Sequence, residues 1–502
     1  MSYRNISLAQ PVQDWTAGAG STQTSTTTTI YASRQVNTTD TTQDRPIFPG
    51  SNRIVIAFGA TDTFSGHSLA NRMMSAVTFY GADAFSYNTL VGPSLAQTLN
   101  FSMSYAIPAQ TTTYAFQSFT LPDTVAHVVA INFIVSAAST ALVHHLVLHD
   151  CSNSAFFQAT ATATGNPYPN TQTFINAFGS VSTAQSLVGN GVCKAPIWAW
   201  AHGGDSLVTP ASAGIRIGAN HLKYLIAEVH YNNPQSTQGV TDTSVIQLVY
   251  TTTMRTHDVG MLTVGDPGTR FASIPANTAS KAYEAVCSSA CTSLTGAGQW
   301  PTSGVNVFNS FLHMHQFGTK MWNTQMRAGK VLGVRGKVEY WDFNNQIAAQ
   351  SCYTVLPGDQ INTHCIYSTA NSAEVKFGLS SSDEMCMAFL MYFPKMSAMT
   401  QCGYFAFNGV KLDMCGRSGS PIIFSNSQEA QYFDGTSETT CFGGSAQCAP
   451  AVLDSYSMCT GNWTSGSKVD PVAPKTSGAV RTMSAIWGGA FVCALLAAAS
   501  VF

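Results

Sequence analysis

The sequence predicts an all-β fold of two tandem antiparallel β-sandwiches. Between residues 99 and 420, short runs rich in Val, Ile, Phe and Tyr are broken by Gly, Pro, Asn and Asp, as in sandwich strands and their turns. No long segment there has the 3.6-residue period of an amphipathic helix. A stretch of this length suits two sandwiches rather than one, and the break should fall near residues 254–260.

Each predicted strand is a short apolar run bounded by turn residues. In chain order the clearest are RIVIAFGA (53–60), AHVVAINFIV (126–135), ALVHHLVLHDC (141–151), LKYLIAEVHY (222–231), VIQLVYTT (245–252), KVEYWDF (337–343) and MAFLMYF (387–393). Residues 17–43, rich in Ser, Thr, Gly and Gln, favour loops or strand edges. Residues 403–475 are Cys-rich and irregular, so we expect a loop-like tail held by disulfides.

The composition limits the classes of partner. Charged residues make up only 10% of the 502 residues and the net charge is −2, so no basic field is available for nucleic acid. Ser, Thr, Asn and Gly take the place of charge, which suits an extracellular surface that carries glycans. N-glycosylation sequons start at Asn5, Asn37, Asn100 and Asn462.

The cysteines and the termini indicate the secretory pathway. Of 13 cysteines, only Cys493 lies in an apolar C-terminal tail, and the even remainder favours disulfides in an oxidising compartment. The uncharged tail after Arg481 predicts membrane attachment, through a GPI signal or a single transmembrane anchor. The first residues, MSYRNISLAQ, lack the apolar core of a signal peptide, so we expect a longer precursor.

The first candidate metal site lies in two predicted strands. His144 and His145 are adjacent in an apolar strand and would point to opposite faces unless the strand bulges there. His149 follows four residues later, as a ligand, a supporting residue or a surface residue. His230 lies in the strand AEVHYNN.

The second candidate site is the segment FLHMHQFG. His313 and His315 are two residues apart, so a strand would direct both to one face. Imidazole suits copper, zinc, iron and nickel. A lone strand histidine is more often structural than a ligand, but the pairs favour one or two metal sites. Spacing alone leaves a zinc hydrolase open.

Several motifs in order resemble the copper type II, ascorbate-dependent monooxygenases, in particular their dopamine β-hydroxylase branch. They are TTYAFQSFTLP (112–122), ALVHHLVLHDC (141–151), WAWAHGG (198–204), YLIAEVHYNNP (224–234), CSSACT (287–292), FLHMHQFG (311–318), LPGDQINTHCIYST (356–369) and SSDEMC (381–386). The resemblance covers residues 99 to 405. It implies that the two sandwiches are jelly-roll-like and form a copper monooxygenase core.

The resemblance also implies a domain order and a reaction. The expected parts are a partial DOMON β-sandwich (1–98), an N-terminal (99–254) and a C-terminal (255–405) monooxygenase domain, a Cys-rich tail (406–475) and an anchor signal (476–502). The family uses ascorbate to reduce two coppers and inserts one oxygen atom from O2 into an activated C–H bond of a small molecule.

The family's ligands carry over residue by residue. Its first copper, which stores an electron, is held by the equivalents of His144, His145 and His230. Its second copper, where O2 and substrate react across an open cleft from the first, is held by the equivalents of His313, His315 and Met385. A soft thioether favours Cu(I), in agreement with that role. Beside His230, Glu228 and Tyr231 are candidate orienting residues.

Disulfide pairings are implied by the same resemblance. They are Cys151–Cys193, Cys365–Cys386, Cys287–Cys402, and Cys291 with one of Cys415, Cys441, Cys448 or Cys459. Connectivity within the tail does not follow from the sequence.

Two positions depart from the relatives that hydroxylate peptides. Where those enzymes bind a substrate carboxylate with an arginine and a tyrosine, this chain has Phe311 and Phe389. The expected substrate is therefore a small, aromatic or amine-bearing molecule rather than a peptide terminus. The alternatives are a non-catalytic cell-surface binding or adhesion protein that keeps the fold, and a zinc-dependent hydrolase. Oligomeric state is not readable.

Overall fold

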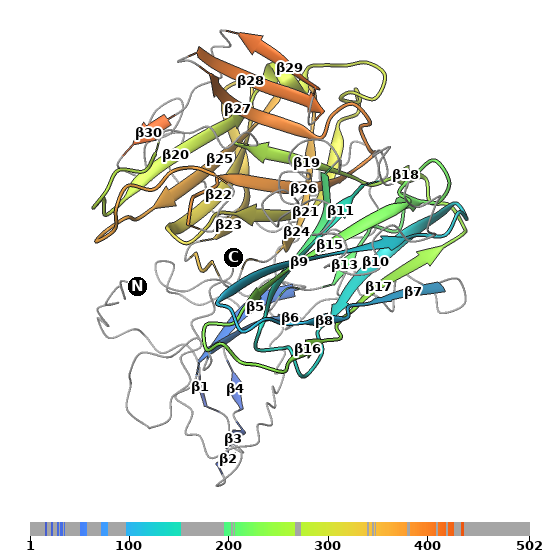
Figure 1. Cartoon of the computed structure of the whole chain (residues 1–502). Coiled ribbons are helices and arrows are strands. Elements are labelled where there is room, and N and C mark those ends of the chain that lie inside the picture. Colours follow the sequence, from blue (N-terminus) through green and yellow to red (C-terminus); the bar gives the residue numbers. More distant parts are fainter. Residues whose placement is uncertain are drawn as a thin grey trace. The chain divides into compact units, whose positions relative to one another are not determined.

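The chain folds into β-sheets, as Figure 1 shows for the computed structural model. The structure describes residues 97–407 apart from 152–194, 202–203, 205, 267–272, 339–340, 344–345, 347 and 379–381, with short pieces before residue 79 and between residues 410 and 435. It separates into one unit of residues 1–84 with 470–502 and another of residues 85–469. In the described residues the only helix is α5 (Ser289–Thr292).

The first sandwich has two sheets, with strand orders β18-β14-β10-β17-β7, where β13 also pairs with β10, and β12-β11-β15-β9. Its strands are β7 (Gln97–Ser102), β9 (Thr112–Thr120), β10 (Ala126–Ile134), β11 (Val143–Asp150), β12 (Ala195–Ala201), β13 (Leu207–Val208), β14 (Ala213–Ile217), β15 (Tyr224–Asn232), β17 (Val245–Thr251) and β18 (His257–Asp258). A small ribbon of β8 (Tyr105–Ala106) and β16 (Thr241–Asp242) adjoins them. All pairs are antiparallel except β14 with β18.

Strand alternation decides which face of the first sandwich can carry a site. In β15, Leu225, Ala227 and Val229 pack into the core between the two sheets. Because successive side chains point to opposite faces, Glu228 and His230 lie on the other face of this sheet. The apolar residues that made this strand predictable therefore also set the direction of its histidine.

The second sandwich again pairs two sheets, with orders β24-β21-β26-β19-β27-β28-β29 and β23-β22-β25-β20-β30. Its strands are β19 (Gly260–Gly265), β20 (Lys281–Cys287), β21 (Val305–His313), β22 (Gly318–Arg327), β23 (Lys330–Val338), β24 (Ala348–Val355), β25 (Asp359–Tyr367), β26 (Met387–Phe393), β27 (Gln401–Phe407), β28 (Val410–Arg417), β29 (Ser420–Ser425) and β30 (Phe433–Gly435). One core cluster joins residues of both sheets, among them Tyr283, Leu312 and Leu390.

Two predictions about the second sandwich were wrong. The segment 403–475 is not loop-like from its start, because β27 reaches Phe407 and because β28 and β29 extend the sheet that contains β19 and β26. The run VKLDM (410–414) does alternate apolar and polar residues as a strand does, but the prediction followed the cysteine content of the segment instead. The predicted strand 337–343 also ends early: β23 stops at Val338, and Trp341 to Phe343 follow outside any strand.

Three disulfides fasten the second sandwich: Cys287–Cys402, Cys291–Cys415 and Cys365–Cys386. The first and third are pairings that the family resemblance implied, and Cys415 is one of the four candidates for Cys291. Cys151 is disulfide-bonded as well, and its expected partner Cys193 lies outside the described residues.

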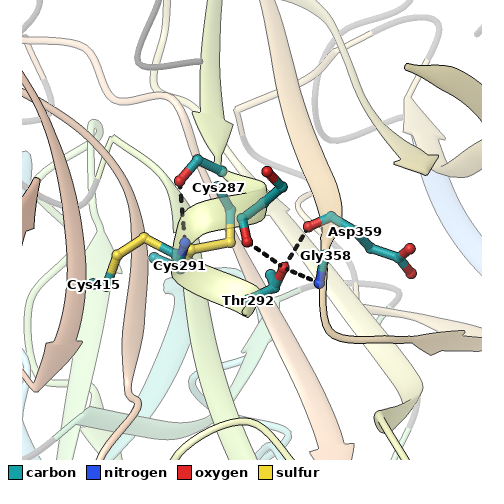
Figure 2. Close-up of a disulfide and its surroundings, with 9 residues drawn as sticks. Cys287, Cys291, Thr292, Gly358, Asp359 and Cys415 are labelled. Atoms are coloured by element: carbon teal, nitrogen blue, oxygen red, sulfur yellow. Dashed lines mark hydrogen bonds between the residues drawn. A yellow bond between two sulfur atoms is a disulfide. The ribbon is translucent and has the colours of Figure 1, made fainter. Parts of the chain in front are cut away.

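Figure 2 shows how the short helix α5 is held between strands. Cys291 bonds to Cys415 of β28. Thr292 Oγ1 donates to the carbonyl of Asp359 at 2.7 Å and accepts from the Gly358 N–H at 3.0 Å. Covalent and polar contacts therefore connect this helix to both sheets of the second sandwich.

Before the first sandwich, the structure describes only short antiparallel pairs. They are β1 (Thr16–Ala17) with β4 (Ala32–Ser33), β2 (Thr22–Gln23) with β3 (Thr28–Thr29), and β5 (Ser51–Ala57) with β6 (Arg72–Thr78). β5 is the strand expected at 53–60, and the DOMON assignment stays a prediction. In the described parts of the chain no helix has the length and apolar character needed to cross a membrane. The predicted anchor, 476–502, lies outside those parts.

Candidate metal centres

A β-bulge brings the adjacent histidines of β11 to one site. The pairing of β11 with β15 shifts register between Val143 and His145, and His145 lies directly opposite His230. The extra residue in the bulge is His144, whose side chain no longer has to take the face opposite to that of His145. The irregularity that the sequence required for a shared site is therefore present.

The three imidazoles form a compact cluster. Ring centroids are separated by 5.3 Å for His144 and His145, 4.7 Å for His144 and His230, and 4.9 Å for His145 and His230. One ring nitrogen of each residue lies within 4.8 Å of the others. Such a triad can hold one metal ion and leave a coordination position open.

The cluster fits a metal better than it fits a hydrogen-bonded core. His230 is buried, and both of its ring nitrogens lack a hydrogen-bond partner, which is costly for a buried polar group. Burial and the neighbouring His144 lower the pKa of His230 to about 3. Burial, followed by the surrounding imidazoles, lowers the pKa of His145 well below its usual range. The rings of His145 and His230 are thus neutral at physiological pH, the form that binds metal.

Tyr114 supports this cluster, a contact that the sequence did not reveal. It lies opposite His230 in the pairing of β15 with β9, and the two rings stack with centroids 4.4 Å apart and an interplanar angle of 9°. The stack limits the orientations open to the His230 ring. Only the strand order β11-β15-β9 brings the two residues together.

The second centre lies at the end of β21. The rings of His313 and His315 are 5.0 Å apart. His313 donates from Nδ1 to Oε1 of Gln346 at 2.6 Å, and His315 donates from Nδ1 to the carbonyl of Asp383 at 3.0 Å. Since both acceptors are carbonyl oxygens, the proton of each ring is on Nδ1 and the lone pair is on Nε2. Both rings are therefore in the tautomer that offers Nε2 to a metal.

The amide orientation of Gln346 follows from its second bond. Its Nε2 donates to the carbonyl of Phe343 at 3.1 Å, which leaves Oε1 for His313. Burial and the neighbouring His315 lower the pKa of His313 to about 3, against an opposing effect of the bond to Gln346. The ring is neutral, like those of His145 and His230.

Met385 lies two residues before β26 and is buried. Its position is fixed by its backbone carbonyl, which accepts a 2.6 Å hydrogen bond from the Tyr367 hydroxyl, and by the adjacent disulfide Cys365–Cys386. These contacts place the segment of Met385 at the same edge of the sandwich as His315. The ring of His315 bonds to Asp383, two residues before Met385.

Glu384 joins the two ligand segments and was not predicted. Its carboxylate accepts hydrogen bonds from the backbone N–H of His315 at 2.8 Å, Phe317 at 2.6 Å and Met385 at 3.3 Å. Burial raises its pKa to about 8, although these N–H groups act in the opposite direction. The residue ties β21's end to the segment that carries Met385. Its place directly before a predicted ligand was the one signal in the sequence.

Aromatic side chains lie on one side of the second centre. Phe311 and Phe389 lie opposite each other on β21 and β26, with rings 6.1 Å and 6.3 Å from that of His313. The alternate residues Ala388 and Leu390 belong to the sandwich core. Phe389 and Met387 thus lie on the same face as His313, a point that the sequence did not decide.

The two residues proposed to orient His230 form hydrogen bonds to other residues instead. Glu228 accepts a 3.1 Å hydrogen bond from Nε2 of His149, and the Tyr231 hydroxyl donates to Asp242 at 2.7 Å. Tyr231 points into the core, since it is the next residue after His230 on a strand. His149 is outside the three-histidine cluster and pairs with Glu228 instead.

Sequence comparisons agree with this geometry. Residues 99–238 match the family described as copper type II ascorbate-dependent monooxygenase, N-terminal domain, and residues 257–427 match its C-terminal domain. The chain belongs to this copper monooxygenase family. The C-terminal match extends to residue 427 and so includes β28 and β29, in agreement with the sheet.

Relatives in the copper monooxygenase family include proteins named for amine hydroxylation. The chain is 28% identical over 399 residues to human DBH-like monooxygenase protein 1, covering 76% of this chain and 60% of that protein. It is 34% identical over 206 residues to tyramine beta-hydroxylase of Caenorhabditis briggsae (40% and 34% covered). It is 29% identical over 274 residues to dopamine beta-hydroxylase of Canis lupus familiaris (54% and 40% covered). The chain thus spans less than two thirds of the length of these relatives.

Proposed function

We propose that this chain is a copper-dependent monooxygenase that hydroxylates an activated C–H bond of a small aromatic molecule, with O2 as oxidant and ascorbate as reductant. The observation that carries the proposal is the pair of unlike imidazole groups. One has three clustered rings, with His230 buried and unsatisfied. The other has two rings whose tautomers are set by Gln346 and Asp383, next to the segment of Met385.

Within this proposal, His144, His145 and His230 hold one copper, and His313, His315 and Met385 hold the other. Copper in such centres supplies one-electron chemistry and activates O2. The chain's own contribution is to keep His145, His230 and His313 neutral, to fix the tautomers of the second pair and to orient the rings. Tyr114 and Gln346 serve orientation directly, and Glu384 holds the His315 and Met385 backbones together.

The surroundings of His313 support an aromatic substrate. Phe311 and Phe389 provide apolar ring surface beside it, and aromatic rings pack well against such a surface. Two relatives are named for tyramine and dopamine, which are both aromatic amines. A peptide carboxylate would lack a charged partner at these two positions.

The disulfides favour an oxidising compartment. We therefore place the proposed enzyme in the secretory pathway or outside the cell. Attachment to a membrane through residues 476–502 is part of the proposal and rests on the sequence alone.

Product analysis tests this function directly. The copper-loaded protein is incubated with ascorbate, ¹⁸O2 and a panel of phenethylamines, with a glycine-extended peptide as the contrasting substrate. We expect one ¹⁸O atom in a hydroxylated phenethylamine, none in the peptide, and no product from His313→Ala. Copper binding without any labelled product from the panel would favour the non-catalytic binding protein. If metal analysis of the purified protein finds zinc in place of copper, a hydrolase is favoured.

A further inference from the structure

One aromatic ring contacts ligand residues of both candidate centres. The ring of Phe343 lies 5.2 Å from that of His144, with an interplanar angle of 36°, and 6.1 Å from that of His315, with an angle of 82°. The first sandwich supplies His144, whereas Phe343 belongs to the connection between β23 and β24 of the second.

The residues on both sides of Phe343 are fastened to the second centre. Trp341 donates from Nε1 to the carbonyl of His315 at 3.0 Å, and its backbone N–H donates to the carbonyl of Thr319 at 3.0 Å. Gln346 accepts from His313 at 2.6 Å and donates to the carbonyl of Phe343 itself at 3.1 Å. These hydrogen bonds on both sides of Phe343 therefore fix its backbone relative to the second centre.

The chemistry of the ring suits a spacer. A phenyl ring has no ligand atom and no hydrogen-bonding group, so it can pack on an imidazole from each centre without binding either metal. The ring is half-buried, and its removal takes away the packing contacts with both imidazoles.

The geometry points to Phe343 as a positioning residue that sets the separation of the two copper centres. The inference rests on the proposed function, because it requires copper in both centres. Phe343 acts through His144 and His315 and is not itself a ligand.

Electron paramagnetic resonance can measure this separation. The full chain is loaded with Cu(II), its copper content is determined, and the distance distribution between the two ions is obtained from their dipolar coupling. The variants are Phe343→Ala, Phe343→Leu and the conservative Phe343→Tyr. Phe101→Ala is the matched control, because Phe101 is a half-buried ring that packs on Phe119 in the first sandwich.

We expect a narrow distribution for the parent chain, for Phe343→Tyr and for Phe101→Ala. Phe343→Ala and Phe343→Leu should bind the same amount of copper but give a distribution about twofold broader, since the ring contact is lost. An unchanged distribution in both variants would overturn the inference and leave the proposed function intact. Failure of the parent chain to bind copper at both centres would overturn both. If Phe343→Ala does not fold, Phe343→Leu decides.

Discussion

Oε1 of Gln346 lies 2.6 Å from Nδ1 of His313, 33 residues earlier in the chain. This bond decides which nitrogen of the imidazole faces a metal. It also shows how a residue outside the ligand set can control the site, because its own amide is oriented by the carbonyl of Phe343. Similar partners of metal-binding histidines are worth about 10- to 100-fold in metal affinity.

Replacement of Gln346 should therefore weaken one copper site only. Gln346→Leu removes the acceptor, and we expect the affinity of the His313 centre for Cu(I) to fall about 10- to 100-fold. Gln346→Glu keeps an acceptor and should retain most of the affinity. Competition titration with a Cu(I) chelator measures the change. The control is Gln247→Leu, which alters an amide in the first sandwich. Equal affinities for Gln346→Leu and the parent chain would contradict this role.

Glu384 should matter for both stability and copper content. In Glu384→Gln one oxygen becomes an NH2 group that must face a backbone N–H, so a buried hydrogen bond is lost on one side. We expect unfolding to become easier by about 1–3 kcal/mol, together with loss of copper from the His313 centre. Denaturant unfolding and metal analysis measure the two effects. Glu374→Gln is the control, because Glu374 pairs with Ser273 at an exposed position. Full copper content in Glu384→Gln would count against a clamp between His315 and Met385.

Replacement of a single ligand histidine should remove the copper of one centre and leave that of the other. His230→Ala leaves the first cluster with two imidazoles, and we expect its copper to be lost while that of the second centre stays. His149→Ala is the matched control, since His149 lies on the same strand as His145 but bonds to Glu228. It should retain about two coppers per chain. Loss of copper from His149→Ala would show that the structure misassigns the ligand set.

The metal-free protein should lose stability as the pH falls below about 6.5. In the folded chain the pKa of His230 is lowered from 6.5 to about 3, so the unfolded chain takes up a proton that the folded chain does not. The free energy of unfolding therefore decreases from pH 6.5 toward pH 3, by about 2 kcal/mol for such a histidine at pH 5. Urea unfolding between pH 5 and 7 measures the slope. His230→Asn should have a shallower slope, and an identical slope would refute this assignment.

The fold could be predicted to a large extent because its signals are local. Apolar alternation in β15 predicts both the strand and the face of His230. The adjacent His144 and His145 demanded a bulge, and the bulge is present. In contrast, β28 was missed although VKLDM (410–414) alternates, because the cysteines around it favoured an irregular tail held by disulfides.

The supporting residues could not be predicted, because their contacts join segments far apart in the chain. Glu384 and the backbone of His315 are 69 residues apart. Tyr114 meets His230 only through strand order. Phe343 was assigned to a strand on the β-propensity of its aromatic neighbours, yet it lies in a connection where its ring contacts His144 and His315.

The most direct test is X-ray absorption of the copper-loaded protein after reduction with ascorbate. A thioether ligand gives a sulfur scatterer beside one of the coppers, whereas imidazoles give only light-atom scattering. We predict a sulfur contribution in the parent chain and in the control Met399→Leu, whose methionine is buried in the core, and its loss in Met385→Leu. Absence of sulfur in the parent chain, or its persistence in Met385→Leu, would contradict the assignment of two unlike copper centres.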